Sequence, residues 1–395
     1  MNTKPNEKRI FTLDNQKDFA ILSGDFNPIH ISPIEARRTL SGGCIVHGIH
    51  AFLWSLEILC KNGYNSFGSF DIRFRNPILL NQKVDYYYDP NENIIELKVE
   101  ENSCVFIRIK PSKLVTEKII SIGLEIKEKV DFPRIIDKEL FDKNELISTY
   151  FSGNKTLAKK LFPALSRFSG EGIICQIASL SEIIGMQVPG MHSLFSNAKI
   201  TLEKSSKKPS INIYKFDTRF GLIGINCIYK NLTAELEAYF RPLPINVQSC
   251  DELAKDYGSI DFRDSNALIV GGSRGLGACT AKLIIIGGGK VTITYNEGEE
   301  EASIVQEDIL KFGGKCSIKK LNMLSDDIPP IYDNSINQIY YFASPKIRDN
   351  KSAKFDQILY KSYMSFFVDG LKKLFRKGYF NNINSFFYPS TIFID

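Results

Sequence analysis

The chain has 395 residues, a length typical of two or three domains. Hydrophobic residues make up 43% and charged residues 24%, so the chain can bury ordinary cores and lacks the composition of a disordered protein. The net charge of +5 is small for this length, which argues against nucleic-acid binding and suits a small anionic ligand.

The cysteines and the N-terminal residues indicate where in the cell the protein is expected. The eight cysteines are scattered, none forms a Cys-x-x-Cys pair, and no Cys/His set has zinc spacing. We therefore expect free thiols in a reducing cytosol and no metal site. The start, MNTKPNEKRIF, lacks the apolar region of a secretory signal, and no stretch approaches 18 uncharged apolar residues. The prediction is a cytoplasmic protein with no membrane span.

The first predicted domain covers residues 1–125. The stretch LSGDFNPIHIS, residues 22–32, precedes an almost wholly apolar segment from Ile45 to Cys60, which predicts a buried helix. Short β-rich runs follow, separated by Asn, Pro and Gly, as in a meandering antiparallel sheet. One buried helix followed by four or five strands predicts a sheet wrapped around a helix, an α+β fold.

The second predicted domain, residues 126–250, repeats this outline. LSRFSGEGIICQIASLSEIIG is again an apolar helix, and four β-rich runs follow it. Setting Gly172 on Gly48 brings Ser179 onto Ser55, a register consistent with a duplicated unit. The second copy has no Asp-x-Asn-Pro-x-His, and Glu171 stands at the place of His47. We therefore expect a degenerate copy.

The third predicted domain, residues 258–395, alternates strands and helices. SNALIVGGSRGLGACTAKLIIIGGGKVTITYN indicates a strand, a glycine turn, a helix and a second strand, and two further strands follow. Such alternation predicts a partial α/β domain with a parallel sheet.

Two interpretations of GDFNPIH follow from its residues. Asp25 or Asn27 caps a helix with Pro28 in its first turn, so that Asp25 and His30 only shape turns. Alternatively, the acid and the histidine work as a pair. Three of the four histidines lie in this part of the chain, and Gly48 is expected at the start of the buried helix, where backbone N–H groups favour an anionic oxygen. An acid and a base beside such an oxygen suit the addition or removal of water.

FAILSGDFNPIHISPIEA followed by GGCIVHGIHAF resembles the MaoC-type hot-dog (R)-specific enoyl-thioester hydratases and dehydratases over roughly residues 10–90. The resemblance implies that Asp25 and His30 activate a water and move protons at the α and β carbons of a trans-2-enoyl thioester. It implies that the backbone N–H of Gly48 binds the thioester oxygen.

Supporting roles also follow from the resemblance. Asn27 and Pro28 would fix the turn, and His47 belongs to the motif, although a structural role for it is at least as well supported. His50 and His192 are expected to be structural. Hot-dog units pair to form an acyl tunnel, so the degenerate second domain would act as an internal partner. A homodimer is a further expected assembly, and the acyl carrier is CoA or acyl carrier protein.

The turn GGSRGLG, set between a strand and a helix, resembles that of short-chain dehydrogenases/reductases, where glycines let the backbone approach a pyrophosphate. Arg274 in the turn and Asn296 after the second strand, where NAD users carry an acid, favour NADP(H) as the cofactor. The predicted nucleotide site consists of Gly271, Ser273, Arg274, Gly275, Leu276, Gly277 and Asn296.

Departures from this second family are large. Tyr341-Phe342-Ala343-Ser344 stands where the family has Asn-Asn-Ala-Gly. YPSTIFID resembles the strand that carries the catalytic serine, at Ser390 or Thr391, but no Tyr-x-x-x-Lys follows it. The sequence therefore predicts no reductase activity and a truncated or vestigial nucleotide-binding module.

The sequence thus favours a tandem hot-dog hydratase/dehydratase of fatty-acid or polyketide-like metabolism, which needs no cofactor, fused to an incomplete Rossmann-like domain. Three alternatives stay open. One is an NADP-dependent 3-ketoacyl reductase fragment with hot-dog acyl-binding domains, another is a non-catalytic acyl-thioester-binding scaffold, and a lesser one is a hot-dog thioesterase.

Overall fold

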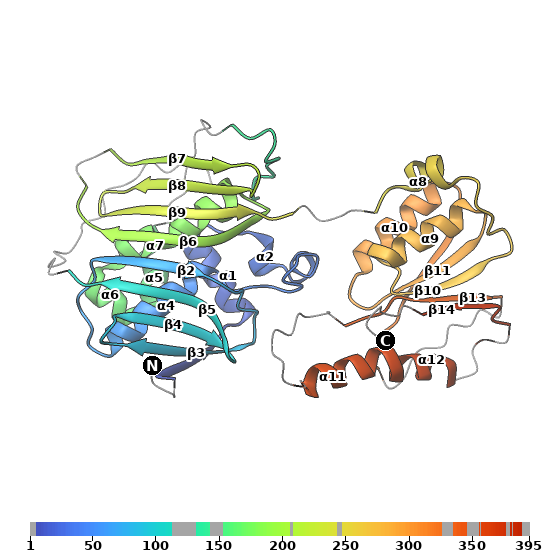
Figure 1. Cartoon of the computed structure of the whole chain (residues 1–395), viewed down its shortest axis with the longest axis horizontal. Coiled ribbons are helices and arrows are strands. Elements are labelled where there is room, and N and C mark those ends of the chain that lie inside the picture. Colours follow the sequence, from blue (N-terminus) through green and yellow to red (C-terminus); the bar gives the residue numbers. More distant parts are fainter. Residues whose placement is uncertain are drawn as a thin grey trace. The chain divides into compact units, whose positions relative to one another are not determined.

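The computed structural model describes residues 5–112, 132–142, 153–205, 208–242, 247–325, 335–345, 355, 357–376, 380 and 382–388. The chain divides into two compact units, a first unit of Met1–Pro244 and a second unit of Ile245–Asp395. Figure 1 shows both units with their elements labelled. No helix among the described residues combines the length and the apolar character that a membrane crossing requires.

The first unit contains a nine-stranded antiparallel sheet of order β1-β3-β4-β5-β2-β6-β9-β8-β7. Its strands are β1 (Glu7–Ile10), β2 (Ser69–Phe74), β3 (Lys83–Asp89), β4 (Ile94–Val99), β5 (Asn102–Lys110), β6 (Ser193–Leu202), β7 (Ser210–Asp217), β8 (Leu222–Ile228) and β9 (Leu232–Phe240). The strands β2 and β6 pair antiparallel at the centre. Outward from this pair, the order is β5-β4-β3 on one side and β9-β8-β7 on the other.

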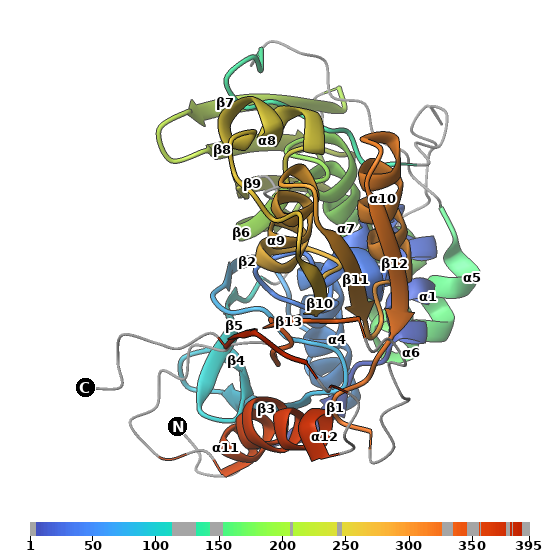
Figure 2. The same cartoon turned by 90° about the vertical axis from the view of Figure 1, so that its right-hand side faces the viewer.

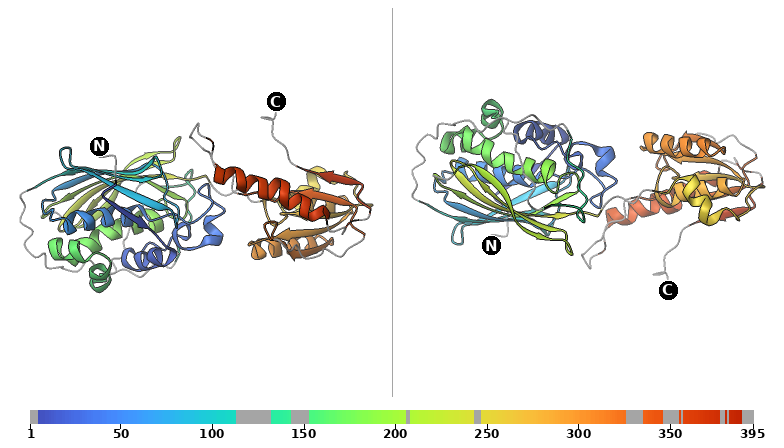
Figure 3. Two further views of the ribbon diagram at one scale, coloured as in Figure 1. Left: turned by 90° about the horizontal axis from the view of Figure 1, so that it is seen from below. Right: turned by 90° about the horizontal axis from the view of Figure 1, so that it is seen from above.

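The helices of the first unit gather on one face of this sheet, as Figure 3 shows. The two central ones are α4 (Gly48–Lys61) and α7 (Glu171–Glu182), which pack against each other. The remaining helices are α1 (Leu13–Ser23), α2 (Pro28–Ile31), α3 (Pro33–Ala36), α5 (Lys155–Leu161), α6 (Pro163–Ser169) and the π-helix η1 (Ile183–Gln187). Residues from both halves of the sheet and from both central helices form one continuous hydrophobic core.

The buried helix expected from Ile45 to Cys60 is confirmed as α4, with a later start. Every residue of α4 from Ile49 to Leu59 is buried, which explains its almost wholly apolar sequence. Ile45 lies outside the helix because its backbone forms a β-bridge with Leu79. The helix predicted near Glu171 is α7, and its continuation as η1 was not predicted.

The second unit contains a five-stranded parallel sheet of order β12-β11-β10-β13-β14, in agreement with the predicted α/β alternation. The strands are β10 (Asn266–Val270), β11 (Lys290–Tyr295), β12 (Lys315–Lys320), β13 (Gln338–Tyr341) and β14 (Ser385–Phe387). The helices are α8 (Cys250–Tyr257), α9 (Gly275–Ile286), α10 (Glu299–Lys311), α11 (Gln357–Tyr363), the π-helix η2 (Met364–Gly370) and α12 (Leu371–Arg376).

Helices cover both faces of the parallel sheet, with α9 and α10 on one face and α11 to α12 on the other (Figures 1 and 2). Each face has its own hydrophobic cluster. The helix α8 packs on α9 within this unit, although it precedes residue 258, where the sequence predicts the domain to begin. Ser390 and Thr391 lie outside the described residues.

Candidate active site

The turn that carries Asp25 is built by local signals. Helix α1 ends at Gly24, whose φ of 83° places it in the left-handed region that glycine adopts readily. Asn27 then caps α2, because its side-chain oxygen accepts a hydrogen bond from the Ile29 N–H at 3.2 Å, and Pro28 occupies the first turn. Of the two candidate cap residues, Asn27 is therefore the cap of α2. The Asp25 carboxylate accepts a hydrogen bond from the Asn27 N–H at 3.1 Å and lines a cavity.

Asp25 and His30 come together at this cavity. The Oδ2 atom of Asp25 lies 3.9 Å from the Nε2 atom of His30, too far for a direct hydrogen bond. The Nδ1 atom of His30 lies 2.9 Å from the carbonyl oxygen of Ile45, which can only accept. A neutral His30 therefore carries its proton on Nδ1 and presents the lone pair of Nε2 beside the carboxylate. This pair can act on a small oxygen ligand such as water.

His47 supports the pair from behind. Its ring stacks on the His30 ring with centroids 3.8 Å apart, and the side chain is fully buried. Its ring nitrogens contact the Gln16 side-chain oxygen at 2.9 Å and the Asp25 backbone oxygen at 3.1 Å. His50 lies one turn further along α4 and stacks on Phe19 in the core. These contacts hold the His47 ring behind the His30 ring and place the His50 ring in the core.

Burial governs the protonation of this cluster. Desolvation raises the pKa of Asp25, while the neighbouring His30 and a hydrogen bond from Ser181 oppose that rise. Desolvation lowers the pKa of His30, against the attraction of Asp25, and lowers the pKa of His47 well below its ordinary value. His30 and His47 are therefore neutral near pH 7. Burial moves the pKa values of Asp25 and His30 toward each other, and the attraction between the two groups opposes this shift.

The second half of the first unit contributes residues that the sequence did not indicate. Ser181 on α7 donates a hydrogen bond of 2.7 Å from Oγ to Asp25 Oδ2. Gly185 on η1 packs so closely that a Cβ there would overlap the Asp25 carboxylate. The Asn27 amide donates to the carbonyl oxygens of Gly185 and Gly190 at 2.9 and 3.1 Å. The position of Ser181, two residues beyond the aligned Ser179, was its only sequence signal.

Gly48 begins α4 at the edge of the same cavity, which has a volume of about 320 Å³. The first N–H groups of a helix have no partner within the helix, so they are available to an oxygen ligand. A Cβ on Gly48 would lie 2.7 Å from the ring of Phe74, so glycine is required for this packing. The structure thus brings Asp25, His30 and Gly48 to one cavity, with Asn27, Pro28 and His47 around it.

Asp25, His30 and His47 also have potential metal-ligand atoms within 4.8 Å of one another. However, both ring nitrogens of His47 already contact oxygen atoms, and His30 Nδ1 contacts the Ile45 carbonyl. That leaves His30 Nε2 and the carboxylate, which are too few ligands for a closed zinc site. The donor set fits acid–base chemistry better than a structural metal.

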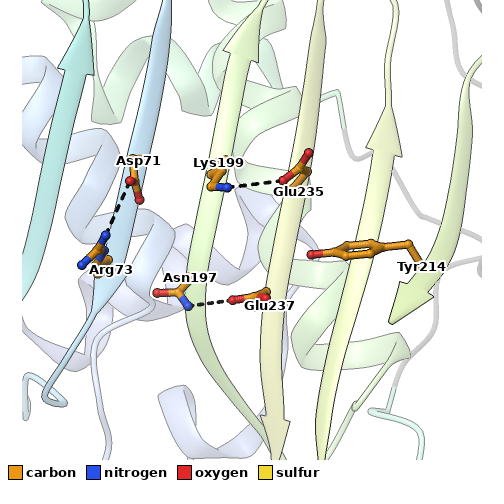
Figure 4. Close-up of a pocket in the computed structure, with 7 residues that line it drawn as sticks. All are labelled: Asp71, Arg73, Asn197, Lys199, Tyr214, Glu235 and Glu237. Carbon is orange, nitrogen blue, oxygen red and sulfur yellow. Dashed lines mark hydrogen bonds and ion pairs between the residues drawn. The ribbon is translucent and has the colours of Figure 1, made fainter. Parts of the chain in front are cut away.

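A second hollow of about 340 Å³ lies on the opposite, open face of the same sheet. Its charged groups pair with one another: Lys199 lies 3.7 Å from Glu235, Arg73 lies 3.8 Å from Asp71, and Asn197 donates to Glu237 at 2.8 Å. Figure 4 shows the Lys199–Glu235 and Asn197–Glu237 pairs crossing from β6 to β9 and the Asp71–Arg73 pair lying along β2. Such mutually compensated groups are typical of a hydrated sheet face rather than of a catalytic pocket.

The predicted nucleotide site lies at the carboxyl ends of β10 and β11. Gly271 and Gly275 have positive φ values of 84° and 55°, and a Cβ on Gly277 would overlap the Gly271 carbonyl, so the three glycines are required by backbone geometry. Ser273 and Arg274 occupy the turn, Arg274 directly precedes α9, and Leu276 lies in the first turn of that helix. Asn296 is exposed immediately after β11. The turn therefore has the geometry of an anion site at a helix N-terminus.

Comparisons with known proteins relate the chain to two families. Residues 2–102 match the family model of the MaoC like domain. The short-chain dehydrogenase/reductase FrzI of Cladobotryum sp is 42% identical over 55 residues, 14% of this chain and 21% of that protein. The peroxisomal multifunctional enzyme type 2 of Mus musculus is 26% identical over 175 residues, 40% of this chain and 24% of that protein. The chain thus spans about a fifth to a quarter of these curated relatives.

The similarity extends to solved structures. A MaoC-like dehydratase is 8% identical with a TM-score of 0.40, covering 60% of this chain and 96% of that one. A short chain dehydrogenase from Burkholderia cenocepacia J2315 in complex with NADP is 21% identical with a TM-score of 0.25, covering 29% of this chain and 49% of that one. The resemblance noted in the sequence is confirmed: the chain carries a MaoC-like domain, joined to a part that is similar to short-chain dehydrogenases/reductases.

Proposed function

We propose that the first unit catalyses the reversible hydration of trans-2-enoyl thioesters, which in the other direction is the dehydration of (R)-3-hydroxyacyl thioesters. This proposal rests on one observation. Asp25 and His30, whose Oδ2 and Nε2 atoms lie 3.9 Å apart, line the same cavity as the N-terminus of α4. The match of residues 2–102 to the MaoC like domain supports it.

The chemistry follows from the arrangement of these groups. Water bound between Asp25 and His30 gives up a proton to one of them as its oxygen bonds to the β carbon. The protonated pair then delivers this proton to the α carbon, so that one water is added, Asp25 and His30 return to their starting protonation states and no cofactor is needed. The backbone N–H of Gly48 and the α4 dipole stabilise the thioester oxygen while it is enolate-like.

We further propose that the first unit is a duplicated hot-dog, with halves near 1–125 and 126–250 and one working site. From the centre outward, the strands follow the order β2-β5-β4-β3 in the first half and β6-β9-β8-β7 in the second. Each half therefore has the same strand order, which supports the duplication. The contacts of Ser181 and Gly185 with Asp25 support a partner role for the second half.

A second candidate function, binding of NADP(H) with or without a 3-ketoacyl reduction, concerns the second unit, with a domain near 258–395. The glycine turn geometry and the 42% identity to FrzI over 55 residues favour it. Titration of the whole chain with NADPH and NADH, followed by nicotinamide fluorescence, tests this binding.

The hydratase proposal is tested with trans-2-butenoyl-CoA and trans-2-octenoyl-CoA by following the loss of the conjugated enoyl absorbance. We expect turnover by the wild type, and a loss of about 10²- to 10⁴-fold in kcat for Asp25→Asn and His30→Ala, because each removes one proton-transfer group. His192→Ala serves as the control, since His192 is a histidine outside the cavity lining.

Two outcomes contradict the proposal. The first is folded wild-type protein that hydrates neither the CoA thioesters nor the same acyl groups on acyl carrier protein. The second is release of free thiol, which identifies a thioesterase instead. CoA and carrier-protein substrates compared in one assay also identify the acyl carrier.

A further inference from the structure

We propose that Phe74 and Phe195 form an aromatic wall that restricts the site to short acyl chains. This inference rests on the proposed hydratase function. It concerns the part of the cavity beside Gly48, where the reacting end of the acyl chain has to lie. Both rings line the cavity, and their centroids are 5.0 Å apart, so the two rings are in contact and no acyl chain passes between them.

Phe74 reaches the cavity because of strand alternation in β2. Asp71 and Arg73 lie on the open face of the sheet, as Figure 4 shows, whereas Phe70 and Ile72 are buried on the helix-covered face. Phe74 continues the buried series, and its ring packs against Gly48. The ring therefore bounds the space in which the thioester oxygen meets the helix N-terminus.

Phe195 reaches the same place through a β-bulge. In β6, Asn197 and Lys199 lie on the open face with Asp71 and Arg73, so simple alternation would place Phe195 there as well. The register with β9 shifts between Phe195 and Asn197, which brings Phe195 opposite the buried Ala238. The bulge thus turns Phe195 inward to meet Phe74 across the β2–β6 seam.

The cavity that remains is small and largely apolar. Its volume of about 320 Å³ is at the lower end of the range of roughly 300–1,000 Å³ for small-molecule sites. Buried Ala51 and Val105 line it further along α4 and on β5. With the rings in place, this space suits a short acyl group, and their removal would extend it along the seam.

The test compares Phe74→Ala and Phe195→Ala with the wild type on trans-2-enoyl-CoA substrates of 4, 8 and 12 carbons. The control is Phe70→Ala, because Phe70 lies on the same strand and face but outside the cavity lining. Leucine variants at the three positions cover the case that an alanine variant does not fold. We expect the ratio of kcat/KM for the 8-carbon to the 4-carbon substrate to rise about tenfold or more in both wall variants and to stay constant in the control.

Binding of saturated butanoyl-CoA and octanoyl-CoA, measured by calorimetry on the same variants, separates this inference from the proposed function. A shift toward octanoyl-CoA without any turnover supports the wall and contradicts the hydratase. Turnover with an unchanged length ratio in all folded wall variants overturns the wall and leaves the hydratase standing. A ratio that rises equally in the Phe70 variant also overturns the wall, and absence of both binding and turnover overturns both proposals.

Discussion

The two central helices of the first unit occupy equivalent places beside the sheet but serve different ends. At its start α4 has His47 and Gly48 beside Asp25, whereas α7 has Glu171 and Gly172. Further along, the alignment of Gly48 with Gly172 sets Glu57 against Ser181. Ser181 donates to Asp25 at 2.7 Å, while Glu57 accepts from the backbone N–H groups of Ala164 and Leu165 at 3.2 and 2.8 Å.

The second half of the first unit lacks counterparts of Asp25 and His30. Its residues are nevertheless constrained by their contacts with this pair. In the second half, Ser181 and Gly185 contact the carboxylate of the first half, across the central β2–β6 pair. In the first half, the equivalent position Glu57 caps the helix α6 instead. The same helix position therefore contacts the Asp25 carboxylate in one half and caps a helix in the other.

The largest effect is expected for Gly185→Ala, which tests whether the second half constrains the Asp25 carboxylate. The added methyl group would overlap the Asp25 carboxylate, so either the carboxylate or η1 has to shift. Because small displacements of catalytic groups cost about 10²-fold in rate, we expect hydration to fall by that factor or more. Overpacking should also lower the free energy of unfolding by about 1–3 kcal/mol.

Steady-state hydration and urea unfolding measure these two effects. Gly43→Ala is the matched control, because its new methyl group would meet only Leu79, at an ordinary contact distance of 3.7 Å. Full activity in Gly185→Ala would show that the second half does not constrain the site.

Ser181→Ala is expected to have a smaller effect and a distinct signature. Its hydrogen bond lowers the pKa of Asp25 against the rise that burial causes, so its loss raises that pKa further. If the carboxylate form is active, the acidic limb of the kcat/KM profile then moves to higher pH. A hydrogen bond to a charged group contributes about 1.5–3 kcal/mol, so kcat/KM near the limb should fall roughly tenfold or more.

The matched control is Ser179→Ala on the same helix, since the Ser179 hydroxyl contacts the Gln176 carbonyl and the Tyr229 hydroxyl instead of Asp25. Asp25 and His30 interact, so the profile reports the apparent pKa of the pair. Equal profiles for both serine variants would assign Ser181 a packing role only.

These two residues also mark the limit of what the sequence could predict. The Asp25–His30 turn was predictable because its determinants are local: Gly24 ends a helix, Asn27 caps the next one and Pro28 fits its first turn. The apolar run of α4 likewise identified a buried helix. The contact of Ser181 with Asp25 depends on the packing of α7 against α1 between residues 156 positions apart, and no local pattern encodes such a contact.

The same limit applies to the shape of the cavity. Period-two alternation predicts which side chains of β2 are buried, but it places Phe195 of β6 on the wrong face, because the bulge between Phe195 and Asn197 shifts the register. The π-helix η1, which brings Gly185 against the carboxylate, is equally invisible in an apolar run. Sequence periodicity thus gave the elements, and the local irregularities that shape the site required the structure.

The smallest effect is expected for Glu57→Gln, which changes the first-half residue that aligns with Ser181. The glutamine keeps one oxygen, so it loses one of the two backbone hydrogen bonds at the start of α6, and it also loses the charge that faces Lys61 at 3.6 Å. Loss of a helix cap costs about 0.5–2 kcal/mol, and we expect a decrease of about 1 kcal/mol in the free energy of unfolding. The exposed Glu35→Gln is the control for the loss of an ion pair, because Glu35 lies 2.8 Å from Arg38. Because Glu57 contacts the backbone of α6 rather than Asp25, the pH profile of hydration should stay unchanged.

A shifted profile in Glu57→Gln, measured beside Ser181→Ala, would mean that both helix positions act on the same site. The two halves would then be less specialised than their contacts indicate.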